Sequence, residues 1–168
     1  LEIVRSWFRE PFGEGRHVKR VEKTKESDRE KIVFTNGVFD ILHQGHIQLL
    51  KFAKSLGGKL IVGINSDRAV KILKGPDRPI NKAIDRKAAL ENFHFVDEVV
   101  IFDDTQTVGI ISELKPNVVV KGGEWTPEEV RRRDRIPDEI EVKTFPLVTE
   151  PSGKKYSTTG IVEKIKSS

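Results

Sequence analysis

The sequence contains no cysteine and no methionine among its 168 residues. The absence of cysteine excludes disulfide bonds, iron–sulfur clusters, thiolate zinc sites and cysteine nucleophiles, and it is typical of an intracellular protein. No apolar run approaches the roughly 18 residues that a membrane-spanning helix needs, and the N-terminus lacks the apolar stretch of a signal peptide. We therefore expect a cytoplasmic protein without a membrane partner.

The chain also lacks a strong excess of one charge. Thirty Lys and Arg stand against 26 Asp and Glu, which leaves a net charge of +4 and favours anionic partners only weakly. The length is that of one domain. Residues 1–30 are rich in charges of both signs, whereas short apolar runs begin at Lys31. We predict a charged N-terminal extension over residues 1–30 and one domain over residues 31–168.

Five short apolar segments, mostly β-branched and bounded by Gly, Asp, Asn or Pro, are typical of buried parallel strands. They cover residues 32–35, 60–64, 99–102, 118–120 and 140–144. Helical patterns alternate with them, and the connections are short. This order predicts an α/β fold: a Rossmann-like, doubly wound, five-stranded parallel sheet with helices on both faces.

Several signals mark the ends of the expected helices. An apolar face over residues 49–56 is followed by Gly57, which we expect to be the C-cap. Thr126, with Glu129 three residues later, forms a capping box. A last helix is expected over residues 157–166, with an apolar face that docks on the sheet.

The segment that follows the first strand carries the strongest chemical signal. His43 and His46 are three residues apart at the start of a helix, so their side chains point to the same side. Gly45 leaves room for a phosphate, and the free amides of a helix N-terminus favour anions. Two imidazoles at such a place can donate hydrogen bonds to a phosphoryl group in its transition state. This spacing indicates phosphate chemistry without a covalent intermediate.

Other interpretations of these histidines compete with this one. A histidine near a helix start is commonly a cap or a surface group, and spacing alone leaves the two interpretations about equal. A zinc site is disfavoured because His17 and His94 have no metal-ligand spacing. A Walker P-loop is excluded, since no Gly-Lys-Ser/Thr follows a glycine-rich loop.

Three further segments occur in an order that completes a known pattern. They are Asn65-Ser66-Asp67, Lys121-Gly122-Gly123-Glu124-Trp125 and Tyr156-Ser157-Thr158-Thr159. Together with Thr35-Asn36-Gly37-Val38-Phe39-Asp40 and His43-Gln44-Gly45-His46, they make residues 31–166 resemble the cytidylyltransferase-like nucleotidyltransferases. Within them the resemblance is strongest to the heptose-1-phosphate adenylyltransferase domain, with glycerol-3-phosphate cytidylyltransferase next.

The resemblance implies a reaction and its participants. AMP would pass from ATP to D-glycero-D-manno-heptose 1-phosphate with release of pyrophosphate, which yields ADP-heptose for the lipopolysaccharide core. Mg²⁺ would be carried by the nucleotide phosphates, with no metal site of the protein's own. No sugar kinase fits beside the transferase in 168 residues, so a separate kinase would act upstream. A homodimer is compatible with the resemblance.

The resemblance also assigns roles to residues. The catalytic residues would be His43, His46 and Thr35. The nucleotide-binding residues would be Asn36, Gly37, Phe39, Gly45, Lys121, Gly122, Gly123, Lys154, Lys155, Ser157, Thr158 and Thr159. The acceptor-binding residues would be Asn65, Asp67, Lys71, Lys74, Arg78 and Arg86. We expect Lys71, Lys74 and Arg78 to lie on one basic loop, and Asp40 to have a structural role.

Two alternatives remain. One is a CTP-dependent cytidylyltransferase that acts on glycerol 3-phosphate or a similar polyol phosphate. The other is a basic nucleic-acid-binding protein that would use the N-terminal extension and Arg131-Arg132-Arg133. The arginine run alternates with acids on a capped helix, so a solvated helix face explains it better, and we expect no nucleic-acid partner. Lys155 stands where close relatives carry Gly, with Lys154 beside it, and an arginine that relatives carry a few residues earlier is missing. We expect Lys154 or Lys155 to replace that charge at the leaving pyrophosphate.

Overall fold

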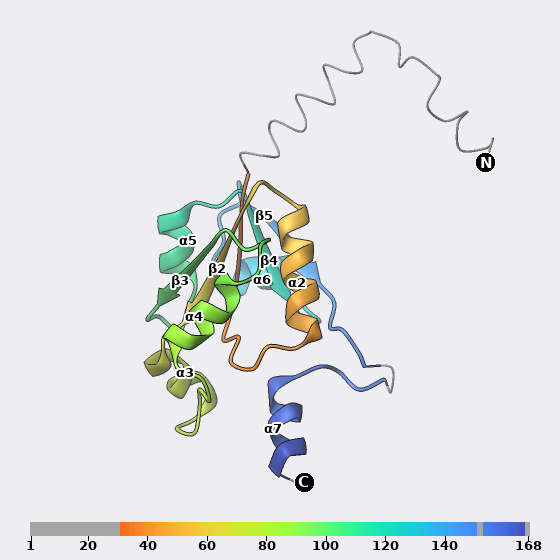
Figure 1. Ribbon diagram of the computed structural model, residues 1–168. Helices are drawn as coiled ribbons and strands as arrows, with labels where there is room; N and C mark the ends of the chain where they lie inside the picture. Colours follow the sequence, from red (N-terminus) through yellow and green to blue (C-terminus); the bar gives the residue numbers. More distant parts are fainter. Residues whose placement is uncertain (1–30, 151–152, 167–168) are drawn as a thin grey trace, which may run out of the picture.

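The computed structural model describes residues 31–150 and 153–166, so the predicted N-terminal extension lies outside the described residues. Within these ranges no helix combines the length and apolar character that crossing a membrane requires. The described part forms one parallel sheet with helices around it (Figure 1).

The sheet has five parallel strands in the order β3-β2-β1-β4-β5. The strands are β1 (Ile32–Gly37), β2 (Lys59–Asn65), β3 (Glu98–Phe102), β4 (Val118–Gly122) and β5 (Glu141–Phe145). Strands β2 and β3 lie on one side of β1, and β4 and β5 lie on its other side. The crevice between the carboxyl ends of β1 and β4 is therefore the switch point at which sheets of this class bind ligands.

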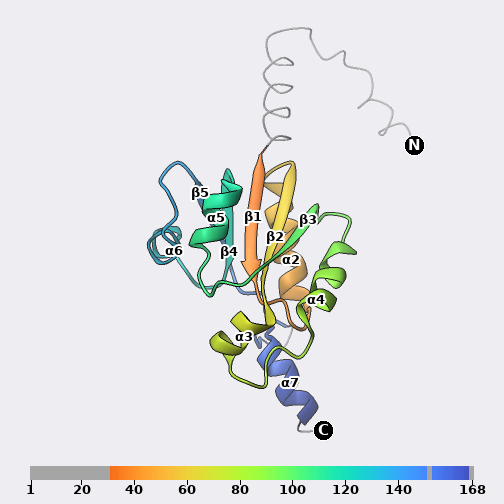
Figure 2. The same cartoon turned by 90° about the vertical axis from the view of Figure 1, so that its left-hand side faces the viewer.

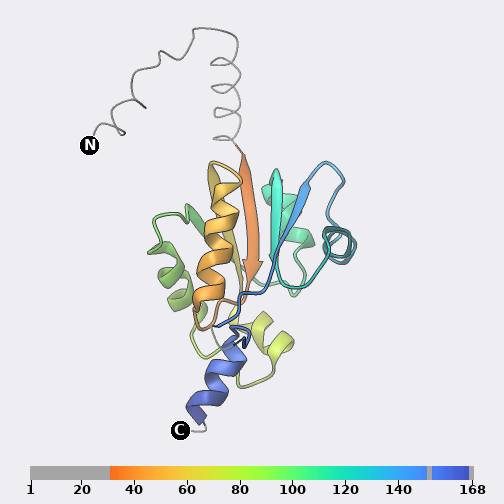
Figure 3. The same ribbon diagram turned by 90° about the vertical axis from the view of Figure 1, so that its right-hand side faces the viewer.

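The helices form a layer on each face of the sheet and a group beyond its carboxyl edge. They are α2 (Gln44–Ser55), α3 (Asp67–Lys74), α4 (Ala83–Glu91), α5 (Val108–Leu114), α6 (Pro127–Asp134) and α7 (Thr158–Lys166). Helices α2 and α4 cover one face and α5 and α6 the other (Figures 2 and 3). Helices α3 and α7 lie near the carboxyl ends of the strands (Figure 1). The predicted fold class is confirmed.

Each face of the sheet has its own apolar core. Val33 and Phe34 are adjacent on β1 and point to opposite faces, yet both are fully buried. Val33 packs in the cluster that contains Leu50 of α2, and Phe34 packs in the cluster that contains Val130 of α6. A strand that is covered on both faces needs a continuous apolar run, which explains why these segments show no alternation of polar and apolar residues.

The structure corrects three local expectations. Residues 67–74 form helix α3, capped by the Ser66 hydroxyl, which accepts a hydrogen bond from Ala69 N; the basic segment is therefore partly helical and not a loop. Helix α7 stands beyond the carboxyl edge, and Ile165 is 68% exposed, so its apolar face does not dock on the sheet. The expected capping box of Thr126 and Glu129 is confirmed.

Gly57 is the third correction, because Leu56 caps helix α2 in a right-handed conformation. The requirement for glycine has a different origin. A Cβ at position 57 would lie 2.7 Å from the Lys31 carbonyl oxygen and 2.8 Å from Val33 Cγ2. Gly57 is therefore needed for the close approach of the chain to the start of β1.

We expect Gly57→Ala to lower the free energy of unfolding by about 1–3 kcal/mol, because the new methyl group meets backbone that cannot move easily. Gly109→Ala is the matched control: position 109 is exposed on α5, with no atom within 4 Å of a new Cβ. There the same substitution should stabilise the protein, by up to about 1 kcal/mol. Denaturant unfolding checks both, and equal effects of the two substitutions would contradict the steric explanation.

Candidate active site

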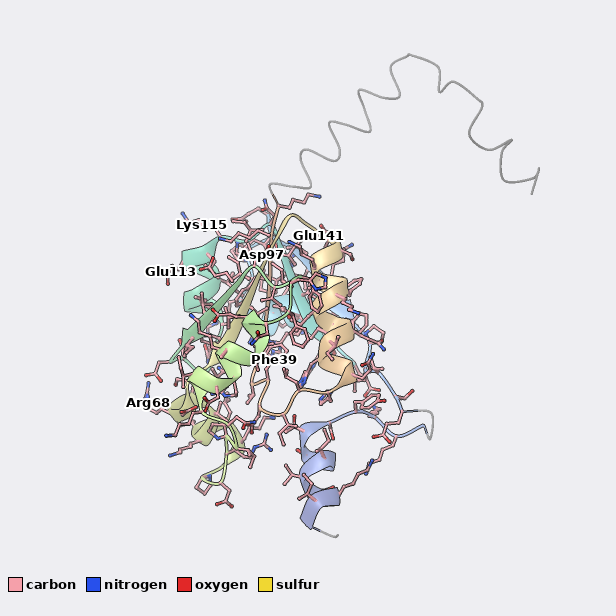
Figure 4. The ribbon with its side chains drawn as sticks, in the orientation of Figure 1. Phe39, Arg68, Asp97, Glu113, Lys115 and Glu141 are labelled. Atoms are coloured by element: carbon pink, nitrogen blue, oxygen red, sulfur yellow. The ribbon has the colours of Figure 1, made fainter. Side chains whose placement is uncertain are left out.

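A cavity of about 360 Å³ opens at the carboxyl ends of β1 and β4, between the N-termini of α2 and α7. Most of the sequence-predicted site residues line it: Asn36, Gly37, Phe39, His43, Gly45, His46, Lys74, Arg78, Lys121, Gly122, Gly123, Ser157, Thr158 and Thr159. Figure 4 shows Phe39 toward this end of the molecule, with Asp97 and Glu141 at the opposite end. Segments that are far apart in the chain thus meet at the switch point.

The two motif histidines form the centre of a stack of rings. The imidazoles of His43 and His46 are parallel, with centroids 3.7 Å apart. Tyr156 continues the stack beyond His43 at 6.0 Å, and Phe39 lies against His46 at 5.0 Å. His43 is the N-cap of α2, and its carbonyl oxygen accepts a hydrogen bond from His46 N at 2.9 Å. This backbone hydrogen bond and the contacts between the rings therefore fix both imidazoles at the N-terminus of α2.

Both histidines are neutral at pH 7. Burial lowers the pKa of His43, and burial together with the nearby charge of His43 lowers the pKa of His46 to about 3. The Nδ1 atoms of both rings are buried without a hydrogen-bond partner in the described part of the chain. A Cβ on Gly45 would lie 3.1 Å from His43 Nδ1, so a side chain there would displace this ring. Each neutral imidazole therefore offers one N–H donor and one acceptor nitrogen at the helix start.

The N-terminus of α7 is tied to the loop that follows β1. Thr158 Oγ1 donates a hydrogen bond to the Ile41 carbonyl oxygen at 3.3 Å, and Ser157 Oγ accepts one from Gly160 N at 3.0 Å. The amide ends of α2 and α7 thus meet at one cavity. Two positive dipole ends with hydroxyls between them suit a ligand that carries several negative charges.

Asp40 connects the loop after β1 to residues 78–81. Its buried carboxylate accepts hydrogen bonds from the backbone amides of Ile80 and Asn81 and from Arg78 Nε, each at 2.8 Å. The predicted structural role of Asp40 fits these contacts. Arg78 lines the cavity as expected, but its guanidinium also forms an ion pair with Asp40. Its charge is thus partly committed inside the protein.

Arg86 is only 2% exposed and has a different location from the one expected of an acceptor-binding residue. It donates hydrogen bonds to three carbonyl oxygens, those of Val38, Asn81 and Asn65, and to the carboxylate of Asp67. These groups come from the loop after β1, from the end of β2 and the first residue of α3, and from the segment just before α4. Arg86 therefore acts as an internal clamp and does not line the cavity.

Three other residues predicted to bind the acceptor also lie outside the cavity. Asn65 donates to the Asp104 carbonyl oxygen, and the Asp67 carboxylate accepts from Arg86 and from Ala83 N. Lys71 is exposed on α3. The side chains of Asn65 and Asp67 are thus engaged in contacts within the protein, and Lys71 faces solvent.

Three residues that the resemblance assigns to catalysis or to nucleotide binding also do not line the cavity. Thr35 is fully buried, and its hydroxyl has no partner among the described residues. Lys155 forms an ion pair with Glu124 at 2.6 Å, and Lys154 is exposed beside it. Neither lysine lines the cavity, so a contact of Lys154 or Lys155 with the leaving pyrophosphate stays a prediction.

The structure adds an apolar wall that sequence reasoning did not assign. Phe145, the last residue of β5, and residues 146–148 after it line the cavity together with Tyr156. The available signal was their position: an apolar run directly after a strand lies at the same carboxyl edge as the motifs. Nucleotide sites combine such apolar surface with a few polar groups, so this wall completes a cavity suited to a base or sugar.

The lowered pKa of His46 predicts how stability depends on pH. The unfolded chain binds a proton at His46 near pH 6.5, whereas the folded protein does so only near pH 3. The free energy of unfolding should therefore fall as the pH decreases from about 6.5 towards 3. In His46→Asn this part of the pH dependence should be missing. Thermal unfolding of both proteins across this pH range is the measurement, and identical slopes would contradict the buried, neutral state of His46.

Comparison with known proteins agrees with this geometry. The cytidylyltransferase-like family model matches residues 34–164. The chain is 44% identical over 153 residues to the bifunctional protein HldE of Campylobacter concisus, and 45% identical over 150 residues to that of Nitratiruptor sp.. Each match covers 89% of this chain but 31% of the relative, so the chain spans about a third of the length of these proteins.

Solved structures show the same fold. A lipopolysaccharide core biosynthesis protein from Thermoplasma volcanium is 28% identical, with a TM-score of 0.58 over 76% of this chain and 98% of its own. Pantothenate synthetase from Thermus thermophilus superimposes with a TM-score of 0.59 at 16% identity, over 88% of this chain and 68% of its own, which is a likeness of fold alone. With its histidine pair, paired helix N-termini and switch-point cavity, the chain belongs to the cytidylyltransferase-like family and is a nucleotidyltransferase.

Proposed function

We propose that this domain transfers AMP from ATP to a sugar 1-phosphate, D-glycero-D-manno-heptose 1-phosphate, and releases pyrophosphate. The product would be ADP-heptose for the lipopolysaccharide core. The observation that carries the proposal is the stacked, neutral pair of His43 and His46 at a helix N-terminus, facing the N-terminus of α7 across one cavity. The likeness to a lipopolysaccharide core biosynthesis protein supports the acceptor class.

The chemistry needs positioning and charge stabilisation rather than a protein nucleophile. An oxygen of the sugar phosphate attacks the α-phosphorus of ATP in line, its bond to phosphorus forms, and pyrophosphate leaves with the electrons of the broken bond. The imidazole N–H groups and the amides of α2 donate to the oxygens that gain charge in the transition state. Because the attacking phosphate is already anionic, no general base is required.

The leaving pyrophosphate would be received by the N-terminus of α7. Ser157, Thr158 and Thr159 line the cavity with hydroxyls and free amides. Among the described residues that line the cavity there is no Asp or Glu. Mg²⁺ would therefore be held by the nucleotide phosphates and water, and it would supply charge neutralisation at the leaving group.

The acceptor phosphate would bind between Lys74 and Arg78, the two cations that line the cavity beside α3. The relatives are bifunctional proteins, of which this chain matches about a third. We propose that a sugar kinase supplies the sugar 1-phosphate from outside the matched part.

The assignment is tested by pyrophosphate release with ATP, CTP, GTP and UTP against a panel of sugar 1-phosphates and polyol phosphates. We expect the highest kcat/KM for ATP with the heptose 1-phosphate. A preference for CTP with glycerol 3-phosphate would overturn the adenylyltransferase assignment and favour the cytidylyltransferase.

His43→Ala and His46→Ala should each lower kcat by about 100-fold or more, the scale of a lost transition-state donor. Both variants should still fold, since each change removes a ring that lines the cavity and leaves the backbone hydrogen bonds of α2 unchanged. Turnover is measured under saturating substrates, and circular dichroism controls for folding. Wild-type turnover in both variants would exclude the proposed role of the pair.

Lys74→Ala should raise the KM for the sugar phosphate more than the KM for ATP, because Lys74 reaches the cavity from α3. Lys71→Ala is the matched control, since Lys71 lies one turn earlier on the same helix and does not line the cavity. Steady-state kinetics with each substrate varied in turn measure the difference. Equal effects of the two substitutions would indicate a general electrostatic attraction instead.

A further inference from the structure

A half-buried chain of polar contacts runs from α6 to the cavity. Lys121 Nζ at the end of β4 lies 2.7 Å from Asn36 Oδ1 on β1 and 3.5 Å from Asp134 Oδ2 at the end of α6. The side chains of Lys121 and Asp134 are 16% and 11% exposed. Asn36 and Lys121 line the cavity, whereas Asp134 does not. Asp134 is thus one contact removed from any ligand.

The chemistry of an ammonium group settles the orientation of the Asn36 amide. Lysine carries only donors, so the amide atom that faces Lys121 must be the oxygen. The Nδ2 group, with two N–H donors, then faces away from Lys121, and within residues 31–150 and 153–166 no group accepts a hydrogen bond from it. Asn36, which lines the cavity, therefore keeps both N–H donors of its amide available to a ligand, while the amide oxygen faces the charge of Lys121.

Asp134 is itself held in place. Arg133 donates to both of its carboxylate oxygens, at 2.8 and 3.1 Å, and the guanidinium of Arg133 lies over the ring of Trp125 at 4.7 Å. Burial by itself would raise the pKa of Asp134, but the hydrogen bond from Arg133 and the charge of Lys121 outweigh it and keep the pKa below its usual value. Burial lowers the pKa of Lys121, and Asp134 opposes that shift. Asp134 therefore helps Lys121 to stay charged.

We propose that Asp134 is a positioning residue that acts through Lys121 to lock the Asn36 amide, so that Asn36 Nδ2 donates to a phosphate oxygen of the bound nucleotide. This inference rests on the proposed function. An anionic acceptor is favoured because the charge of Lys121 polarises the amide and attracts negative charge, and hydrogen bonds to ionised oxygens are the stronger class. Asn36 sits where β1 ends, beside the switch-point crevice.

The test is a double-mutant cycle on nucleotide affinity, measured by calorimetry on the full chain with α,β-methylene-ATP, which cannot be cleaved at the transfer bond. We expect Asn36→Ala to weaken binding about tenfold or more, and Asp134→Asn to weaken it by a smaller factor. In the double variant, Asp134→Asn should add nothing to the loss from Asn36→Ala, because its effect travels through Asn36. Glu128→Gln, which removes a charge from an exposed position of the same helix, should leave affinity unchanged.

The proposal would be overturned if the two substitutions weakened nucleotide binding by independent factors that multiply in the double variant. Full nucleotide affinity in Asp134→Asn would also overturn it. A purely structural Asp134 would lower the melting temperature and weaken binding equally in both backgrounds. If Asp134→Asn fails to fold, Asn36→Asp provides the test. This substitution keeps an oxygen in contact with Lys121 but removes the N–H donors. The variant should therefore fold and bind the nucleotide analogue more weakly than Asn36→Ala does. Wild-type affinity in Asn36→Asp would overturn the proposal.

A parallel titration with α,β-methylene-CTP separates this inference from the proposed function. Tight binding of the CTP analogue alone would overturn the adenylyl assignment, and the cycle would then be run with that analogue. No binding of either analogue by the wild-type protein would overturn both.

Discussion

The buried guanidinium of Arg86 is the interaction on which the geometry of the site depends. It donates hydrogen bonds to carbonyl oxygens in the loop after β1, at the end of β2 and just before α4, and to the Asp67 carboxylate. Asp40 adds a second buried connection between the loop after β1 and residues 78–81. Breaking one partner of such a buried charged network typically costs about 3–5 kcal/mol, since the remaining groups lose their partners without regaining water. The segment that ends at His43 and the first turn of α2 with His46 are therefore held from inside the protein by Arg86, Asp67 and Asp40, none of which lines the cavity.

The fold brings uncharged hydrogen-bond donors together at the cavity. The histidine rings are stacked and neutral, and the N-termini of α2 and α7 contribute amides and hydroxyls. Preformed dipoles of this kind need no reorganisation when charge develops on a phosphate, which is the condition under which they lower a barrier. Cationic groups stand at the margins, with Lys74 on α3 and Lys121 at the end of β4. The arrangement suits in-line transfer of a nucleotidyl group, in which positioning and electrostatics replace covalent catalysis.

The charged residues divide into those that face the cavity and those that shape it. Arg86 and Asp67 hold each other, Lys155 holds Glu124, and Arg78 is shared between Asp40 and the cavity. Residue type does not distinguish these roles, because arginine is equally suited to bidentate binding of a protein carboxylate and of a phosphate. Burial and the geometry of partners make the distinction, as the contrast between Lys74 and Lys71 on one helix illustrates.

The order of elements, the strand segments and the meeting of four motifs at one sheet edge followed from the sequence, because apolar runs and helix signals are local properties and parallel sheets align the carboxyl ends of their strands. Thr126 and Glu129 form their capping box for the same local reason. The neutral state of His46 depends on burial by distant segments, and the clamp made by Arg86 depends on three loops that meet only in the folded chain. The contact of α7 with the loop after β1 joins residues that are 117 positions apart in the chain, so no local signal could predict it. Residue identities and spacing determined where the site lies, whereas tertiary packing alone decided which charges remain free to act in it.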